Sequence, residues 1–288
     1  MTEQPTTRGR AAGTTEPPAP FTRRTPRVVA AGRLHRRRDR DRTGRFLVEG
    51  PQAVREALAD PSAVRELFTT AEAAARHRDL VDGARAAGVP VSPITDDAAG
   101  ALAETVTPQG LFAVCDQRDQ PLSTALRPPP RLAAVLVEIR DPGNAGTVLR
   151  TADAAGAELV VFAGDAVDPY NGKCVRASAG SLFHVTLVRD PDPLAVVAGL
   201  RAAGLRVLAA DAAGDTDLDR LAEAGELAAR TGWLFGSEAH GLPPDVAAAA
   251  DARVRVPIHG RAESLNLGAA AAVCLYASAR ALHAKERS

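Results

Sequence analysis

Polar side chains able to take part in chemistry gather in three short stretches of the sequence, each directly after an apolar run. The first stretch is VEIRDPGNAGTVLRTADAAG, in which Asn144 and Arg150 follow an Asp-Pro-Gly turn. Asn144 suits a helix N-cap, because its side chain accepts a hydrogen bond from a free N–H. Gly146 and Arg150 are four residues apart on one helical face, so the glycine leaves room for a ligand beside the guanidinium. The alternative is a capping asparagine with an ordinary surface arginine.

The second stretch, GWLFGSEAHGLPPDV, places a carboxylate at the end of a buried apolar run. Glu238 lies there between Gly236 and Gly241. A carboxylate at the edge of a sheet is costly unless it faces a ligand or a cation. The alternative is that Glu238 caps the helix that follows.

The third stretch, VRVPIHGRAESLNLGAAAAVCLYASARAL, joins an apolar run to a long alanine-rich helix. Ser264 suits the N-cap of that helix. Asn266 would then lie in the first turn, where asparagine is a mediocre helix former and needs another reason to be present. The small residues that follow allow the helix to pack closely against a neighbour.

The elements that must position these stretches are six apolar runs separated by helical or loop segments. This alternation predicts α/β architecture, with a parallel sheet covered on both faces. Ligands bind such sheets at the carboxyl ends of the strands, where all three polar stretches lie. The predicted strands are 132–139, 158–163, 184–188, 205–210, 232–236 and 253–258.

The chain divides by composition into an arm, a small domain, a linker and a large domain. Residues 1–30 are rich in Thr, Pro, Gly and Arg and predict a disordered basic arm. Residues 31–116 alternate short apolar runs with helical patterns and predict a small α/β domain. The triple proline in QRDQPLSTALRPPPR predicts a linker over 117–131, and the large domain then covers 132–288.

The charge is polarised along the chain although its formal total is zero. Residues 1–45 carry twelve arginines against four acidic residues. A basic arm on an otherwise acidic body indicates contact with a polyanion such as a nucleic acid, whose phosphates arginine neutralises. The alternative is a solvated, disordered tail.

Several function classes are disfavoured by the motifs and by the cysteine pattern. Cys115, Cys174 and Cys274 are far apart and form no CxxC or Cys/His cluster, so we expect no metal site, no disulfide and a cytoplasmic location. No G-x-G-x-x-G follows a strand, and GDAVDPYNGKC lacks the P-loop spacing. The alanine-rich segment contains Arg280 and is typical of a buried helix, so no membrane span is expected.

Together, the three stretches resemble the SpoU/TrmH family of RNA ribose 2'-O-methyltransferases, within the knotted SPOUT superfamily. The first is similar to the family's N-x-G-x-x-x-R-T-A pattern, the second to F-G-x-E-x-x-G-L and the third to I-P-x…S-L-N. FLVEGPQAVREAL and VTPQGLFAV resemble the small N-terminal domain of many members, which is similar to RNA-binding ribosomal proteins. The resemblance covers nearly the whole chain after the arm.

The resemblance implies a fold and a cofactor that the residue pattern alone does not give. The large domain should contain a deep trefoil knot, formed as the C-terminal segment threads a loop. S-adenosylmethionine should lie against the knot and be held mainly by backbone groups. By position, those groups belong to Ala210, Gly236, Val256 and Leu265. Two departures bear on the cofactor, because Ala210 replaces a common threonine and Gly268 a common serine.

The resemblance also implies the partners. The active site should lie at a homodimer interface that includes the long terminal helix. RNA should be bound by the N-terminal domain and the arm, with contributions from Ser264 and from Arg176 of GKCVRASAGSLFHV.

The reaction implied is transfer of a methyl group to a ribose 2'-hydroxyl, with Arg150 contacting the ribose and the adjacent phosphate. Three further residues order that arginine and the methyl donor: Asn144, Glu238 and Asn266. A guanidinium hardly ever loses its proton, so Arg150 is better suited to stabilising the forming alkoxide than to acting as a base. His240 and His259 are the alternative proton acceptors.

The extra N-terminal domain favours 23S ribosomal RNA over transfer RNA as the substrate. Two other functions stay open at this point. One is a non-catalytic RNA-binding protein that retains the fold. The other is a methyltransferase that modifies a base, which the Asn144/Arg150 and Ser264-Leu265-Asn266 motifs disfavour.

Overall fold

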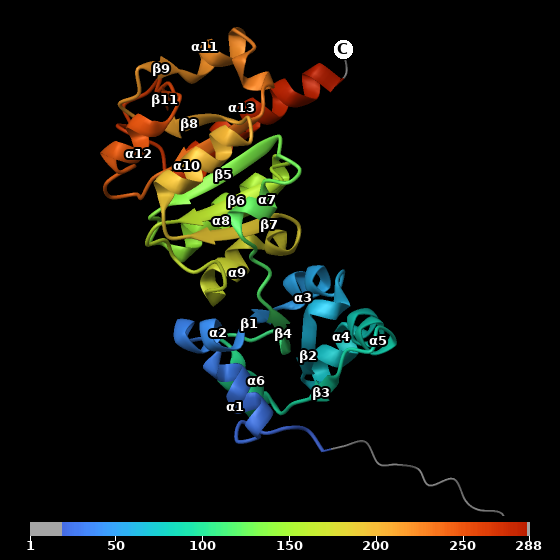
Figure 1. The fold of residues 1–288 in the computed structure, drawn as a ribbon. Coiled ribbons are helices and arrows are strands. Elements are labelled where there is room, and N and C mark those ends of the chain that lie inside the picture. The colour runs from blue at the N-terminus through green and yellow to red at the C-terminus, as the bar shows by residue number, and fades with distance from the viewer. Residues whose placement is uncertain (1–18, 287–288) are drawn as a thin grey trace, which may run out of the picture.

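The computed structural model describes residues 19–286, which form two α/β units joined by one connection (Figure 1). We call the part built on a four-stranded sheet the small unit (19–116) and the part built on a seven-stranded sheet the large unit (132–286). Residues 1–18, which make up most of the predicted arm, lie outside the described residues. The α/β class and the parallel C-terminal sheet are as predicted, and the knot stays a prediction.

The small unit has the strand order β1-β4-β2-β3, with β4 antiparallel to β1 and β2, and β2 parallel to β3. Its sheet separates two layers of short helices. The strands are β1 (Arg45–Glu49), β2 (Val64–Thr69), β3 (Val91–Pro93) and β4 (Leu111–Asp116), and the helices are α1 (Pro26–Arg33), α2 (Arg37–Thr43), α3 (Pro51–Ala57), α4 (Ala71–Arg76), α5 (Arg78–Ala86) and α6 (Asp96–Leu102).

The structure differs from the predicted arm over residues 19–30, which are ordered. Helix α1 begins at Pro26, whose fixed φ suits the first helical position. Val28 and Ala31 on this helix are buried together with residues of α6. The helix is only two turns long, so its apolar positions are too few to give a periodic pattern in the sequence.

The large unit is a seven-stranded sheet in which every pair of neighbouring strands is parallel. Six strands match the predicted apolar runs, and the seventh, β9 (Thr216–Asp217), is a two-residue edge strand that no pattern indicated. The order is β7 (Thr186–Asp190), β6 (Leu159–Ala163), β5 (Leu132–Val137), β10 (Thr231–Phe235), β8 (Arg206–Ala210), β11 (Ala252–Arg255), β9.

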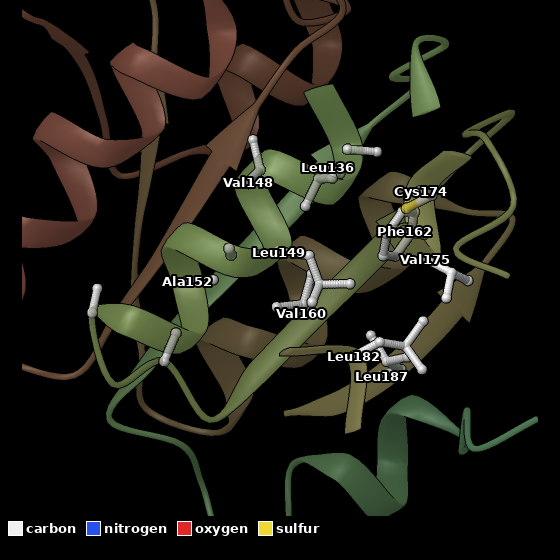
Figure 2. Packing of buried hydrophobic residues seen from close by; sticks show 14 of the residues in the cluster. Leu136, Val148, Leu149, Ala152, Val160, Phe162, Cys174, Val175, Leu182 and Leu187 are labelled. Atoms are coloured by element: carbon white, nitrogen blue, oxygen red, sulfur yellow. The ribbon is translucent and has the colours of Figure 1, made fainter. Parts of the chain in front are cut away.

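Helices cover both faces of this sheet because successive strand residues point to opposite sides. On one face, α8 (Pro142–Ala154) packs Val148 and Leu149 against Leu136 and Val160 of the sheet, as Figure 2 shows. Also on this face are α9 (Gly172–Ser178) and α13 (Leu267–Glu286). On the other face lie α10 (Pro193–Ala202) and α12 (Pro244–Ala249).

Helix α13 is long and apolar enough to span a membrane by length and composition alone. It is, however, a core helix of the large unit, as its sequence predicted. Ala271, Cys274 and Leu275 are fully buried in the same core as α8, and the buried Ser278 Oγ accepts a hydrogen bond from Trp233 Nε1 at 2.9 Å.

The connection between the units, predicted as a linker over 117–131, lies against the large unit. The backbone N–H of Gln120 donates to Leu187 O of β7 at 3.0 Å. A short helix, α7 (Leu122–Ala125), follows. Its Leu122 packs on the face of the sheet that α10 covers. The connection is therefore an ordered part of the large unit's surface.

Candidate functional site

The strand order places the site at the junction of β5 and β10. The chain runs from β5 to β6 and β7 on one side and reaches β8, β10 and β11 on the other. Such a switch in strand order opens a crevice beyond the carboxyl ends of the two central strands. The first polar stretch follows β5 and the second follows β10, so the fold brings both to this crevice.

A cavity of about 420 Å³ occupies the crevice on the β10 side. The loops after β8, β10 and β11 and the start of α13 form its wall. All four positions expected to hold the cofactor lie in that wall: Ala210, Gly236, Val256 and Leu265. Glu238, Ser264 and Asn266 line it as well.

Three of the four predicted catalytic side chains meet at the mouth of this cavity. Asn144 Nδ2 donates a hydrogen bond to Glu238 Oε1 at 2.6 Å. Asn144 Oδ1 accepts one from Asn266 Nδ2 at 3.4 Å. Asn144 therefore forms one hydrogen-bonded row with residues that lie 94 and 122 positions further along the chain.

The side chain of Asn144 is free for these contacts because another residue caps α8. Asp141 is the N-cap, and its Oδ1 accepts a hydrogen bond from the Asn144 backbone N–H at 2.8 Å. The prediction that Asn144 caps the helix is therefore wrong. Lys173 Nζ lies 2.8 Å from Asp141 Oδ2 and, together with the Asn144 N–H, lowers the pKa of the Asp141 carboxyl.

The start of α13 differs from the prediction in the same way. The helix begins at Leu267, and Asn266 Oδ1 accepts a hydrogen bond from the Gly268 N–H at 2.9 Å. Asn266 thus precedes the helix and caps it, and the prediction that Ser264 does so is wrong. This position explains the asparagine, since one side chain both ends the loop and reaches Asn144.

Glu238 is held by a tight loop after β10. Ser237 and Gly241 exchange two backbone hydrogen bonds of 3.0 and 2.8 Å across it. A Cβ atom on Gly236 would lie 2.1 Å from the Gly241 carbonyl carbon, so only glycine fits there. Helix α12 begins after Pro243 with no side-chain cap, which excludes the capping alternative for Glu238.

Arg150 lies apart from the other three predicted catalytic residues. It is exposed on α8, and its side chain makes no hydrogen bond or ion pair with the described residues. The prediction that Gly146 leaves room for a ligand beside Arg150 is also wrong, because Gly146 is buried. A Cβ atom on Gly146 would lie 2.5 Å from Cys174 O, so this glycine allows α8 and α9 to pack closely.

Arg176, expected to contact RNA, lies on α9 between the two units. Its Nη1 is 2.9 Å from Glu104 Oε2 and 3.4 Å from Glu49 Oε2, both in the small unit. In the chain by itself this arginine joins the large unit to the small one.

A second cavity of about 750 Å³ adjoins the first and shares Ser237, Glu238 and Gly241 with it. Asn144 and His240 line this second cavity. His259, the other candidate proton acceptor, lines neither cavity.

Two acidic residues of the first cavity were missed by sequence reasoning, namely Asp211 and Glu263. Asp211 directly follows β8, so the strand-end rule applied to that strand would have found it. No Lys, Arg or His side chain lines this cavity among the described residues, so three carboxylates, counting Glu238, give it a negative charge. Within the same part of the chain, no group of three or more His, Cys, Asp or Glu residues is placed to hold a metal ion.

Two family descriptions match the chain. The SpoU rRNA Methylase family matches residues 131–276. The MRM3-like substrate binding domain matches residues 25–113.

Similar proteins have been characterised or solved. The 23S rRNA (guanosine(2553)-2'-O)-methyltransferase RlmP of Bacillus subtilis is 33% identical over 85% of this chain and 92% of its own length. An AdoMet-bound rRNA methyltransferase from Sinorhizobium meliloti is 31% identical, with a TM-score of 0.78 over 89% of this chain and 95% of that one. The SpoU methyltransferase AviRb from Streptomyces viridochromogenes, in complex with AdoMet, is 31% identical, with a TM-score of 0.75 over 89% and 98%.

Proposed function

The chain belongs to the SpoU rRNA methylase family, and we propose that it transfers a methyl group from S-adenosylmethionine to a ribose 2'-hydroxyl of 23S ribosomal RNA in the cytoplasm. The observation that carries this proposal is the meeting of Asn144, Glu238 and Asn266 at the mouth of one cavity. RlmP and the Sinorhizobium meliloti protein named above are rRNA methyltransferases, and the Sinorhizobium meliloti and AviRb structures contain AdoMet. We also propose that the large unit contains the trefoil knot expected of the family.

The charge of the first cavity suits the methyl donor. S-adenosylmethionine carries a cationic sulfonium, a cationic ammonium group and one carboxylate, so its net charge is positive. The wall offers them Asp211, Glu238 and Glu263 and no competing cationic side chain. Asp211 is partly neutralised by Arg253 at 2.9 Å, whereas Glu263 has no partner among the described residues. The backbone groups at Ala210, Gly236, Val256 and Leu265 are the proposed contacts of the bound donor.

The hydrogen-bonded row would hold the ribose in line with the donor. Aligning the reacting groups can lower a barrier by several kcal/mol without a strong base. Asn144 is fixed at both ends of its amide, so it can present the ribose in one orientation. Arg150 would stabilise the developing alkoxide and the adjacent phosphate, because a guanidinium keeps its charge at any working pH.

Arg150 lines neither cavity of its own chain, and a homodimer would supply an Arg150 from a second copy. Helix α13 presents two exposed apolar side chains, Val273 and Tyr276, at 40% and 45% exposure. Tyr276 Oη donates to Ala154 O at 3.3 Å, so this face of α13 is continuous with the end of α8. A second copy docked on α8 and α13 would cover the apolar side chains and bring an Arg150 to each site.

The test is to map ribose methylation in ribosomal RNA from cells with and without the gene. We expect one 2'-O-methyl mark in 23S RNA to disappear on deletion and to return with the wild-type gene. Titration calorimetry should detect S-adenosylmethionine binding by the purified protein. If the protein binds the donor and deletion removes a mark from transfer RNA but none from ribosomal RNA, the substrate is transfer RNA. If the protein does not bind the donor and no mark is lost, it is not a methyltransferase.

A further inference from the structure

The end of α1, the turn after it and the start of α2 carry four exposed arginines, Arg33, Arg36, Arg37 and Arg38, which we call the arginine ridge. The side chains of Arg33, Arg36 and Arg38 make no hydrogen bond or ion pair in the described part of the chain. Arg37 has one exposed contact, at 3.6 Å from Asp41. The ridge is therefore a patch of largely uncompensated positive charge.

The ridge is unfavourable for the isolated fold. Arg36 is the N-cap of α2 with no side-chain cap bond, and Arg37 and Arg38 begin the helix. Cations near the free N–H groups at a helix start are destabilising, as are like charges close together, and the one acidic residue of the first turn, Asp39, is buried. A sequence that keeps such a conflict commonly does so at a functional site. An anionic ligand would offset both costs.

A buried ion pair fixes the ridge relative to the large unit. Arg40, also on α2, and Asp168 of the large unit are each 3% exposed, and Arg40 Nη2 lies 2.6 Å from Asp168 Oδ2. Arg40 Nη1 donates to the carbonyls of Leu34 and His35 at 2.9 Å each, which are the two residues between α1 and Arg36. The turn that carries the ridge is thus tied to the large unit by the same side chain.

This ion pair ends at the edge of the sheet that holds the cavity. Asp168 lies in the loop after β6, and β6 is the direct neighbour of β5. The carboxyl ends of parallel strands meet at one edge, so the anchor of α2 and the start of α8, which carries Asn144, lie at the same edge. Figure 1 shows α2 beside α9, on the side of the small unit that faces the large one.

We propose that the arginine ridge binds the phosphate backbone of the RNA substrate at a distance from the target ribose that the Arg40–Asp168 pair keeps constant. The proposal rests on the function proposed above and adds the surface that holds the RNA. Guanidinium groups match phosphate in a bidentate manner, which lysine does not, and all four ridge cations are arginine. The contact is with the backbone, so it supplies affinity and register independently of base sequence.

The test compares two variants that remove the same charge. The ridge variant is R33Q/R36Q/R38Q, and the control is R76Q/R78Q/R85Q on α4 and α5, which Figure 1 shows on the far side of the small unit from α2. Binding of transcribed 23S RNA is measured by filter retention between about 50 and 200 mM KCl. Over this range, the loss of roughly three phosphate contacts changes the salt dependence of the affinity enough to be measured. Circular dichroism and calorimetry with S-adenosylmethionine accompany each variant.

The ridge variant should bind RNA about tenfold more weakly, and the slope of log affinity against log salt should fall by about 2 to 3. The control should keep the wild-type affinity and slope. An unchanged slope in the ridge variant, or an equal change in both variants, would overturn the ridge as the binding surface. A wild-type protein that binds neither S-adenosylmethionine nor 23S RNA would instead contradict the proposed function.

Discussion

At the scale of single residues, the proposed chemistry depends on how one amide is held. Asn144 donates to Glu238 and accepts from Asn266, so its nitrogen and oxygen each have an assigned partner. Turning the amide over would set its oxygen against the Glu238 carboxylate and its nitrogen against the Asn266 amide nitrogen. Only one orientation satisfies both neighbours, and this is what makes the residue suited to positioning a ribose.

Replacing Asn144 with aspartate should therefore be worse than removing the side chain. In N144D a carboxylate would face Glu238 across the present 2.6 Å contact, and the two like charges would push the loops apart. We expect methyl transfer to fall by about a hundredfold or more, the scale of one lost preorganised contact, and further than in N144A. Tritium transfer to 23S RNA measures both variants. Equal activity of N144D and wild type would contradict the assigned role.

The charge of the cavity wall predicts selectivity between donor and product. S-adenosylhomocysteine lacks the sulfonium charge, so a negative wall should favour the donor. E263Q removes an unpartnered carboxylate from that wall and should weaken donor binding about two- to fivefold while leaving product binding nearly unchanged, since exposed charges interact weakly in water. Calorimetry with both ligands gives the ratio. E223Q, an exposed change on α11 (Leu218–Glu223) away from the cavity, is the matched control, and an equal effect there would refute the assignment.

At the scale of elements, the close packing of α8 on α9 sets the position of the first polar stretch. Both helices lie against the same sheet face, and at Gly146 they are too close for a Cβ atom to fit between them. Helix α8, which carries Asn144, is therefore held in place along one side by α9. Its first turn is held by the contacts of Asp141 with the Asn144 N–H and with Lys173.

A methyl group at position 146 should separate the two helices. The added Cβ of G146A would lie 2.5 Å from Cys174 O and 2.6 Å from the Ala177 Cβ, and overpacking of this kind costs about 1 to 3 kcal/mol. We expect a lower midpoint in urea and weaker activity. G83A on α5 is the control, because no atom lies within 4 Å of its added Cβ and the helix should gain stability. Matching midpoints for G146A and wild type would show that the packing tolerates the methyl group.

The sequence predicted which helices and strands are present better than it predicted where they begin and end. Buried parallel strands are continuous apolar runs and were readily found, whereas the two-residue β9 and the two-turn α1 carry too few residues for a pattern. The wrong cap of α8 was avoidable, since Pro142 at the first helical position points to Asp141 before it.

The isolation of Arg150 follows from helix geometry that the motif alone conceals. Six residues at about 100° each place Arg150 roughly 120° around α8 from Asn144. The sequence alone could not show which residues lie opposite the face of α8 that carries Arg150. The pairing of Arg176 with Glu49 and Glu104 was equally hidden, because it depends on how two separate sheets are placed.

At the scale of the whole molecule, the two units share one continuous core. Phe46 of the small unit packs against Tyr170 and Phe183 of the large one, with ring centroids 4.7 and 6.1 Å apart. His184 adds a polar contact beside them. Its Nδ1 lies 2.8 Å from Asp153 Oδ2 on α8, and its Nε2 lies 3.2 Å from Glu56 Oε2 on α3.

This histidine predicts a pH-dependent contact between the units. The hydrogen bond to Asp153 and, to a smaller extent, the bond to Glu56 raise the pKa of His184 above its usual 6.5. A raised pKa gives stability that is fully present below about pH 6.5 and is lost as the pH rises through the folded value. The melting temperature of H184Q should therefore fall furthest below wild type near pH 6, and the gap should narrow by pH 9. H259Q, in an exposed loop, should show a gap that does not vary in this way.

The strand order has a consequence for the newly made protein. β5 ends at Val137, but its neighbour β10 begins only at Thr231, and the cavity closes only with the residues that lead into α13. Domains generally fold as they leave the ribosome, N-terminal part first. The small unit, the proposed RNA-binding part, thus leaves the ribosome before the strands that complete the cavity. The methyl transfer proposed above therefore requires the last-made segments of the chain.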